Sequence, residues 1–142
     1  MKLRLVLASM ALALALTPLA APLLAAGHPL TALLIRNFFS VLCHQNPERS
    51  FMVQGSPVAV CIRCLGIYCG AALGMLPPLE SGPAVRLLGW AVLLNLLDVS
   101  SGMLHWHGDL PGTRFLLGLL LGVGVGVVLQ PFAGRLPSAS AR

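Results

Sequence analysis

The sequence predicts an all-α integral membrane bundle of four short transmembrane helices, with one further amphipathic helix lying in the membrane interface. Hydrophobic residues make up 57% of the chain, charged residues make up 9%, and the mean hydropathy is +0.89. The apolar residues fall in long uncharged runs divided by short polar breaks, which is the pattern of a chain that crosses a bilayer. We therefore expect residues 1–142 to form a single transmembrane domain.

The first apolar run covers about residues 5–26 and follows Lys2 and Arg4. Its length of roughly 20 residues is enough to cross the hydrocarbon core. A basic start, an apolar stretch and small residues before His28 also resemble a secretory signal that is cleaved after residue 27. Both interpretations stay open, and the retained helix is favoured because the run is longer than a usual signal core.

Three more spans are expected at about residues 58–76, 85–104 and 114–133. Pro77 and Pro78 end the first of these, because proline cannot continue a helix without losing backbone hydrogen bonds. Residues 31–42 are too few to cross the bilayer. We expect them to form the interfacial helix, with the polar Arg36 side chain facing the lipid head groups.

The positions of Lys and Arg favour an inner (cytoplasmic) membrane protein with both termini in the cytoplasm, because basic residues ahead of the first span usually dominate topology. In this arrangement the cytoplasmic residues are Lys2, Arg4, Arg86, Arg135 and Arg142, and the outer ones are Arg36, Arg49, Arg63 and Arg114. These basic residues stand singly, so nucleic acid is not an expected partner. The expected partner is the lipid bilayer, and a homo-oligomer or a membrane partner protein is left open.

The strongest local signal is a cluster of thiols on the expected outer side. Cys43-His44-Gln45 lies in the long loop, and Cys61-Ile-Arg-Cys64 opens the second span. A Cys-x-x-Cys pair at a helix start reaches one ion, and a loop supplies the remaining ligands of a tetrahedral site. This pattern predicts one zinc-like ion, structural or served to a partner, with Gln45 or Asp98 orienting its ligands: Cys43, His44, Cys61 and Cys64.

Other interpretations of these cysteines stay open, and the sequence does not decide whether the chain is an enzyme. A helix N-terminus and Arg63 lower the pKa of nearby thiols, so Cys61 and Cys64 also fit a thiol-disulfide oxidoreductase. Cys43 would then be the resolving thiol, and a membrane quinone the electron acceptor. A structural disulfide is the third interpretation. Cys69 stands apart in an apolar stretch and is expected to be a core residue.

Three motifs together resemble a known family: Cys43-His44-Gln45, Arg49-Ser50-Phe51 and Cys61-x-Arg63-Cys64-x-Gly66-x-Tyr68-x-Gly70. They are similar to the signature of the uncharacterised prokaryotic membrane family called domain of unknown function 2085. Further family positions are occupied downstream by Leu97-Asp98 and by Arg114 ahead of Gly118 and Gly122, whereas Val99 departs from the family's usual glycine. The resemblance covers roughly residues 41–126. It implies a small multi-helix membrane fold with a Cys-His cluster, and it brings no established reaction.

Two polar residues lie inside the third expected span. Asn95 and Asp98 are three residues apart, so they share a helix face that must point into the bundle or into a wet cavity. A carboxylate there costs about 3 kcal/mol and needs a partner, for which Arg63 and Arg114 are both suitable. The functional alternative is that Asp98 binds a metal or transfers a proton. A transporter or channel component that uses Asp98 is therefore the third function that stays open.

The short loop after that span carries His105-Trp106-His107. Its two imidazoles either join the metal site or sit at the interface beside an anchoring Trp, and the second interpretation is favoured.

Glycines recur every four residues in two of the expected spans: Gly66, Gly70 and Gly74 in the second, and Gly118, Gly122 and Gly126 in the fourth. Small residues at this spacing let helix backbones approach closely in lipid, so we expect the glycines to serve helix packing. Cys61, Cys64 and Tyr68 share the opposite face of the second span, which makes the Tyr68 hydroxyl a candidate to support the thiol cluster.

Overall fold

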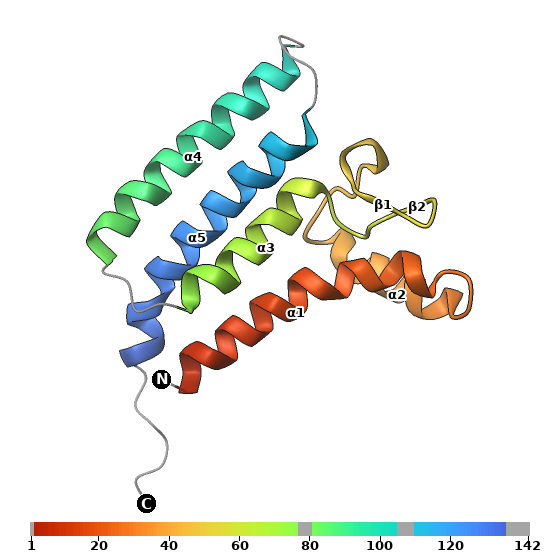
Figure 1. Ribbon diagram of the computed structural model, residues 1–142, viewed down its shortest axis with the longest axis horizontal. Helices are drawn as coiled ribbons and strands as arrows, with labels where there is room; N and C mark the ends of the chain where they lie inside the picture. Colours follow the sequence, from red (N-terminus) through yellow and green to blue (C-terminus); the bar gives the residue numbers. More distant parts are fainter. Residues whose placement is uncertain (1, 77–80, 105–109, 136–142) are drawn as a thin grey trace, which may run out of the picture.

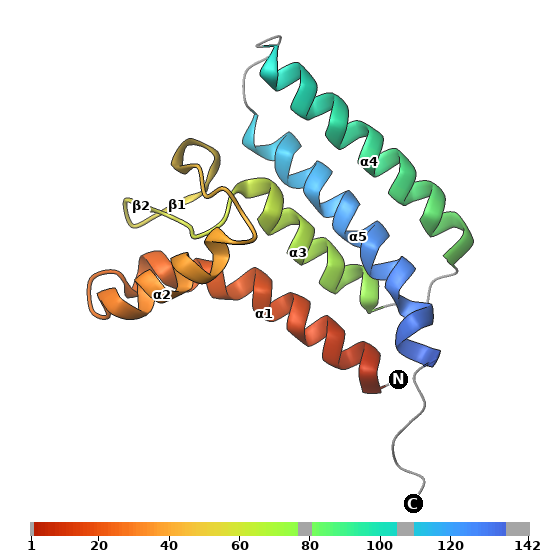
Figure 2. The same ribbon diagram turned by 180° about the vertical axis from the view of Figure 1, so that it is seen from behind.

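The structure is a computed structural model that describes residues 2–76, 81–104 and 110–135. Pro77, Pro78 and the His105-Trp106-His107 loop lie outside the described residues. Its helices are α1 (Lys2–Leu24), α2 (Pro29–Ser40), α3 (Ile62–Met75), α4 (Ser81–Met103) and α5 (Pro111–Arg135). Viewed from either side, α3 lies between α1 and α5, and α4 covers the other flank of α5 (Figures 1 and 2). The predicted all-α membrane fold is confirmed.

Helix α3 is shorter than the expected span over residues 58–76. It contains 14 residues, which at a rise of about 1.5 Å per residue gives a length of roughly 21 Å. The hydrocarbon core of a bilayer is about 30 Å thick. In the described residues three helices, α1, α4 and α5, are long and apolar enough to cross a membrane, so four spanning helices are not confirmed.

Side chains from two other helices donate hydrogen bonds to backbone carbonyl groups at the end of α3. The residue four positions after Gly74 is a proline, which has no N–H to offer to the Gly74 carbonyl. Gln130 of α5 supplies the hydrogen bond instead, with 2.6 Å between Nε2 and the Gly74 oxygen. Arg4 of α1 donates in the same way to the carbonyl of Leu76. These bonds satisfy two of the carbonyl groups at the end of α3.

Residues 58–60 are buried and non-helical, although the sequence predicts them to be helical. A second proline effect explains this, because Pro22 leaves the Pro18 carbonyl in α1 without its helical donor. The N–H of Ala59 fills that place, 3.3 Å from the Pro18 oxygen, and the N–H of Val58 donates to the Phe51 carbonyl at 2.9 Å. The Ala59 carbonyl accepts from the Gln45 side chain at 2.8 Å instead of from an N–H one turn later, and α3 begins at Ile62.

The loop between α2 and α3 contains a 3₁₀ turn (Pro47–Arg49) and a small hairpin that the sequence analysis missed. Strands β1 (Met52–Val53) and β2 (Ser56–Pro57) pair antiparallel, with Met52 opposite Pro57. The turn residues Gln54 and Gly55 have φ angles of 50° and 76°, the combination that two-residue hairpin turns of type I′ require. The hairpin returns the chain to the start of α3.

Helices α3 and α5 touch through their two glycine ridges. A Cβ built at any of the six ridge glycines would come within 3.0 Å of a backbone atom of the other helix. Gly70 would meet the carbonyl of Leu119, for example, and Gly122 would meet the carbonyl of Ile67. The backbones therefore approach so closely that only glycine fits at the contact.

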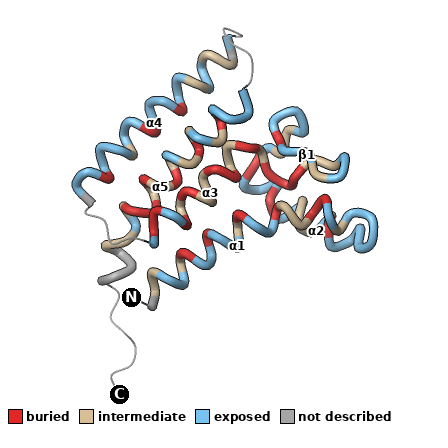
Figure 3. The backbone as a smooth tube through the Cα atoms, in the orientation of Figure 1, coloured by how far each residue is buried: buried red, intermediate tan, exposed pale blue. Residues whose placement is uncertain are grey.

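Helix α2 folds back beside the C-terminal end of α1 (Figure 1). It buries Ala32 and Phe39, while four of its large apolar side chains are exposed: Leu30, Leu33, Leu34 and Phe38. Arg36 is partly buried, and its guanidinium donates to the Pro57 carbonyl. Buried backbone gathers where α1, α2, the 58–60 segment and the start of α3 meet (Figure 3), and Phe39 lies in this core with no exposed surface.

Candidate thiol site

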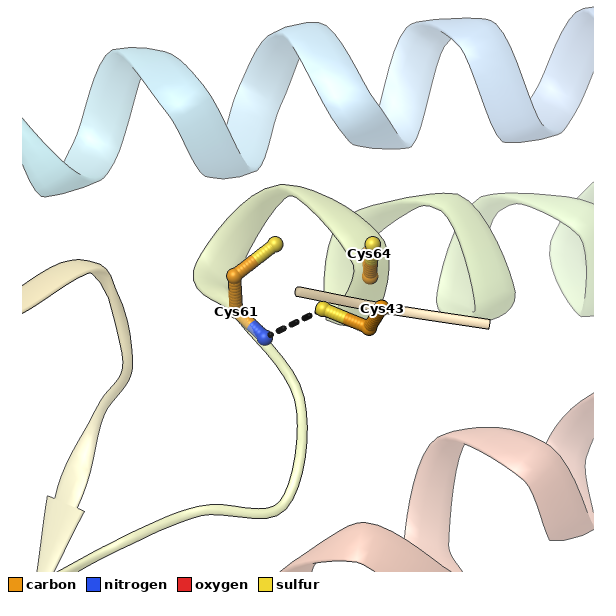
Figure 4. Close-up of side chains that lie close together, drawn as sticks. All are labelled: Cys43, Cys61 and Cys64. Atoms are coloured by element: carbon orange, nitrogen blue, oxygen red, sulfur yellow. Dashed lines mark hydrogen bonds between the residues drawn. The ribbon is translucent and has the colours of Figure 1, made fainter. Parts of the chain in front are cut away.

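Three thiols gather at the centre of that core. The Sγ atoms of Cys43, Cys61 and Cys64 all lie within 4.8 Å of one another, and none of the three is in a disulfide. Figure 4 shows Cys61 and Cys64 on successive turns at the start of α3, with Cys43 brought alongside from the preceding loop. Cys43 is buried, and the other two are partly exposed.

The ends of two helices position these cysteines. Cys61 is the N-cap residue of α3, so Cys64 follows one turn later on the same side. Cys43 comes just after α2, and its N–H donates to the Phe39 carbonyl at 2.9 Å. The site therefore joins the C-terminal end of α2 to the N-terminal end of α3, where the helix dipole favours negative charge.

Gln45 ties the two cysteine-bearing segments together. Its Nε2 donates to the carbonyl of Arg36 in α2 at 2.7 Å and to the carbonyl of Ala59 at 2.8 Å. The backbone of Gln45 has a φ angle of 53°, a left-handed conformation that a residue other than glycine seldom adopts. This turn directs the side chain back between the segments and holds Cys43 beside Cys61.

Hydrogen bonds stabilise a negative charge on Cys43. The thiols of Cys61 and Cys64 lower the pKa of Cys43 most, and the backbone N–H groups of Cys61 and Gln45 add to this effect against the opposing influence of burial. The Cys61 nitrogen lies 3.2 Å from the Cys43 sulfur, as drawn in Figure 4. Because the thiolate is both the metal ligand and the nucleophile, Cys43 is prepared for either chemistry.

His44 does not join the three thiols, contrary to the expected Cys3His shell. It is exposed, and its ring nitrogens are not among the atoms that converge. Cys69 also lies outside the cluster and packs against the core, in the setting expected for it. Arg49 is exposed at the end of the 3₁₀ turn. Tyr68 is partly buried, with its ring centroid 6.2 Å from that of Phe39.

The polar residues predicted inside the third span meet α3 and α5. Asp98 forms an ion pair with Arg63, one of the two partners expected for it, and keeps only 9% of its side chain exposed. Asn95 is buried and donates to the carbonyls of Ala91 at 2.8 Å and Leu117 at 3.0 Å. Arg114 is buried in the first turns of α5. Arg63 thus connects the Cys-x-Arg-Cys turn to α4.

Sequence reasoning missed the residues that form the wall of the site. Val58, Ala59 and Val60 are almost fully buried, with at most 1% exposed. A signal for their placement was present, since two prolines four residues apart in the first span leave the carbonyl of Pro18 free to accept a bond from elsewhere.

Comparison with known proteins places this site inside a shared region. A family model described as "Predicted membrane protein (DUF2085)" matches residues 43–128. An uncharacterized protein of Methanocaldococcus jannaschii is 30% identical over 100 residues, which are 66% of this chain and 64% of that protein. An uncharacterized protein of Methanothermobacter thermautotrophicus is 32% identical over 97 residues, 65% of this chain and 87% of that protein. No solved structure matches the chain.

Proposed function

The chain belongs to the DUF2085 family of predicted membrane proteins, and on that premise we propose that it binds a zinc-like metal ion through Cys43, Cys61 and Cys64. The observation that carries the proposal is the convergence of three sulfur atoms within 4.8 Å. They come from two segments that Gln45 holds together. Thiolate sulfur is a preferred ligand of zinc and of other soft metal ions.

Among the described residues three ligand atoms converge, and this count supports a metal that keeps one position open for another molecule. Structural zinc sites are closed by four protein ligands, whereas sites with three protein ligands keep a fourth position for another molecule. His44 is exposed beside the cluster and does not complete it. We therefore propose that the fourth position is taken by water or by a donor atom of the protein that delivers or receives the ion.

The local electrostatics support the same proposal. Ligand thiols must lose their protons when the metal binds. The lowered pKa of Cys43 and the hydrogen bond from the Cys61 N–H reduce the cost of the first deprotonation. The hydrogen bonds of Cys64 with Cys43 and Cys61, together with burial, raise the pKa of Cys64, so the charge of the bound metal must drive the later deprotonation.

Metal content and free-thiol count on the detergent-purified chain test the proposal. We expect about one metal ion per chain, lost in the Cys61→Ser, Cys64→Ser double variant and retained in the matched Cys69→Ser variant. Thiols that react only after a chelator is added would identify them as the ligands. No bound metal, combined with thiols that appear only after reduction, would exclude the proposal.

A thiol-disulfide oxidoreductase is the second candidate, favoured by the hydrogen bonds that stabilise the Cys43 thiolate. In that reaction Cys43 and Cys61 form a disulfide and lose two electrons and two protons, which a membrane quinone takes up to become a quinol. Cys43 is buried while Cys61 and Cys64 are partly exposed, so a partner's dithiol first attacks the Cys61 sulfur of the Cys43–Cys61 disulfide and releases the Cys43 thiolate. The partner's second thiol then displaces Cys61, which leaves a disulfide in the partner and two reduced cysteines in the chain. Loss of two free thiols on addition of a quinone, restored by a dithiol and absent in the Cys43→Ser variant, distinguishes this function from metal binding.

A further inference from the structure

We propose that a groove between α4 and α5 binds a neutral lipid whose head group carries a free hydroxyl, of the diacylglycerol type. The groove has a volume of about 760 Å³, within the usual range of ligand sites. Its wall is mainly leucine from both helices, and Asp98, Ser100, Ser101 and Thr113 add polar atoms. This inference concerns a different part of the molecule from the thiol site and does not depend on metal binding.

The position of the groove suits a lipid that enters sideways from the bilayer. Both helices that form it are long and apolar enough to span the membrane. Asp98 lies five residues before Met103, the end of α4, which is about 7.5 Å along the helix axis. A polar head group placed at Asp98 is therefore near the membrane surface, and the leucines extend deeper for the chains.

Hydrogen bonding inside the groove selects a head group that donates. The Ser100 hydroxyl donates to the Leu96 carbonyl at 2.8 Å, and the Thr113 hydroxyl donates to the Leu110 carbonyl at 2.9 Å. Each hydroxyl has a single proton, so what remains to a ligand is the capacity to accept. The carboxylate of Asp98 is also an acceptor. The polar atoms of the wall therefore favour a hydrogen-bond donor.

The charges select a neutral head group. Asp98 is already paired with Arg63, so the pair has no net charge to attract an ion. A phosphate near the Asp98 carboxylate would meet like charge and a wall of acceptors, which is unfavourable at low dielectric. An ammonium group would have to displace the Arg63 guanidinium from Asp98, because that carboxylate is already paired. A hydroxyl meets both conditions, because it donates a hydrogen bond to an acceptor and carries no charge.

Native mass spectrometry of the full chain in detergent tests the proposal with two lipids that share their acyl chains, dioctanoylglycerol and dioctanoylphosphatidylglycerol. We expect saturable binding of one dioctanoylglycerol per chain, and at least tenfold weaker retention of the phospholipid. Leu116→Trp fills the groove at an exposed position and is expected to weaken dioctanoylglycerol binding at least tenfold.

The matched control is Leu73→Trp, which places the same side chain in a separate groove of about 430 Å³ between α1 and α3. It is expected to leave binding unchanged. Equal retention of both lipids, or equal effects of the two tryptophan variants, would show ordinary boundary lipid and overturn the proposal. The thiol count of each variant, measured on the same sample, confirms that the fold and the thiol site are intact.

Discussion

The guanidinium of Arg63 donates to the carboxylate of Asp98, and this ion pair joins the cysteine-bearing turn of α3 to the C-terminal half of α4. Along the rest of their length, α5 lies between these two helices (Figure 2). The pair therefore connects the thiol site to the groove between α4 and α5. The loss of folding free energy when the pair is broken is the first quantity to measure.

Asp98→Ala is expected to lower the free energy of unfolding by about 1–3 kcal/mol, because it leaves a partly buried guanidinium without its partner. The value lies below that of a fully buried pair, since Arg63 keeps 24% of its side chain exposed. Thermal unfolding in detergent measures it. The double variant Arg63→Met, Asp98→Leu should recover part of the loss. A single variant as stable as the unmodified chain would show that the pair contributes nothing.

Gly70→Ala is expected to destabilise the chain by about 2 kcal/mol or more, because the added methyl would overlap the Leu119 carbonyl across the α3–α5 contact. Gly89→Ala in α4 is the matched control, since a Cβ there has nothing within 4 Å. The control should be neutral or stabilising by up to about 1 kcal/mol. Equal unfolding temperatures for the two variants would contradict the close contact.

His44→Ala is expected to keep the metal stoichiometry of the unmodified chain, whereas Cys43→Ser loses the metal. The reason is geometric, since His44 is exposed and stands outside the group of three sulfur atoms. Metal analysis of both purified variants decides the question. Loss of the metal in His44→Ala would restore the four-ligand shell predicted from the sequence.

Gln45→Ala is expected to weaken metal binding by about 10–100-fold, the usual effect of removing a group that orients a ligand. The substitution removes both hydrogen bonds that hold the Cys43 segment next to Ala59. Gln54→Ala is the control, because Gln54 is exposed and has a similar φ angle of 50°. Competition with a chromophoric chelator measures the two affinities, which should differ only for Gln45.

The exposed apolar face of α2 is expected to lie at the membrane interface, as its amphipathic sequence predicts. A tryptophan at Leu34, which is 60% exposed, should be quenched by brominated lipids in a chain whose native tryptophans are replaced by phenylalanine. A tryptophan at Gln54, on the hairpin turn, serves as the water-exposed reference. Equal quenching at both positions would exclude an interfacial α2.

The long helices were predictable because hydrophobic runs and prolines are local signals. The expected 5–26, 85–104 and 114–133 spans correspond to α1, α4 and α5 within a few residues. The start of α3 was not predictable in this way. Residues 58–60 are as apolar as a helix, and they bond to Pro18, Phe51 and the Gln45 side chain, none of which a local pattern indicates.

The thiol cluster was predictable in part for a similar reason. A Cys-x-x-Cys spacing fixes two ligands on one helix, and Cys43 was recognised as a third from its place in the loop. His44 was placed in the site only because it follows Cys43 in the sequence. Neighbouring residues in a non-helical segment point in different directions, so this adjacency does not bring both side chains into one site. Cys43 is buried and His44 exposed, an outcome set by the turn at Gln45, whose positive φ angle has no clear signature in the sequence.

The interlocked glycine ridges also limit how the thiol site can move. The close glycine contacts repeat every four residues along each helix, so α3 can slide along α5 only in whole steps of about 6 Å. Intermediate positions would force side chains against the backbone of the other helix. Cys61 and Cys64 are therefore held at a fixed position relative to α5. Any movement that opens the site is therefore expected in the segment that carries Cys43.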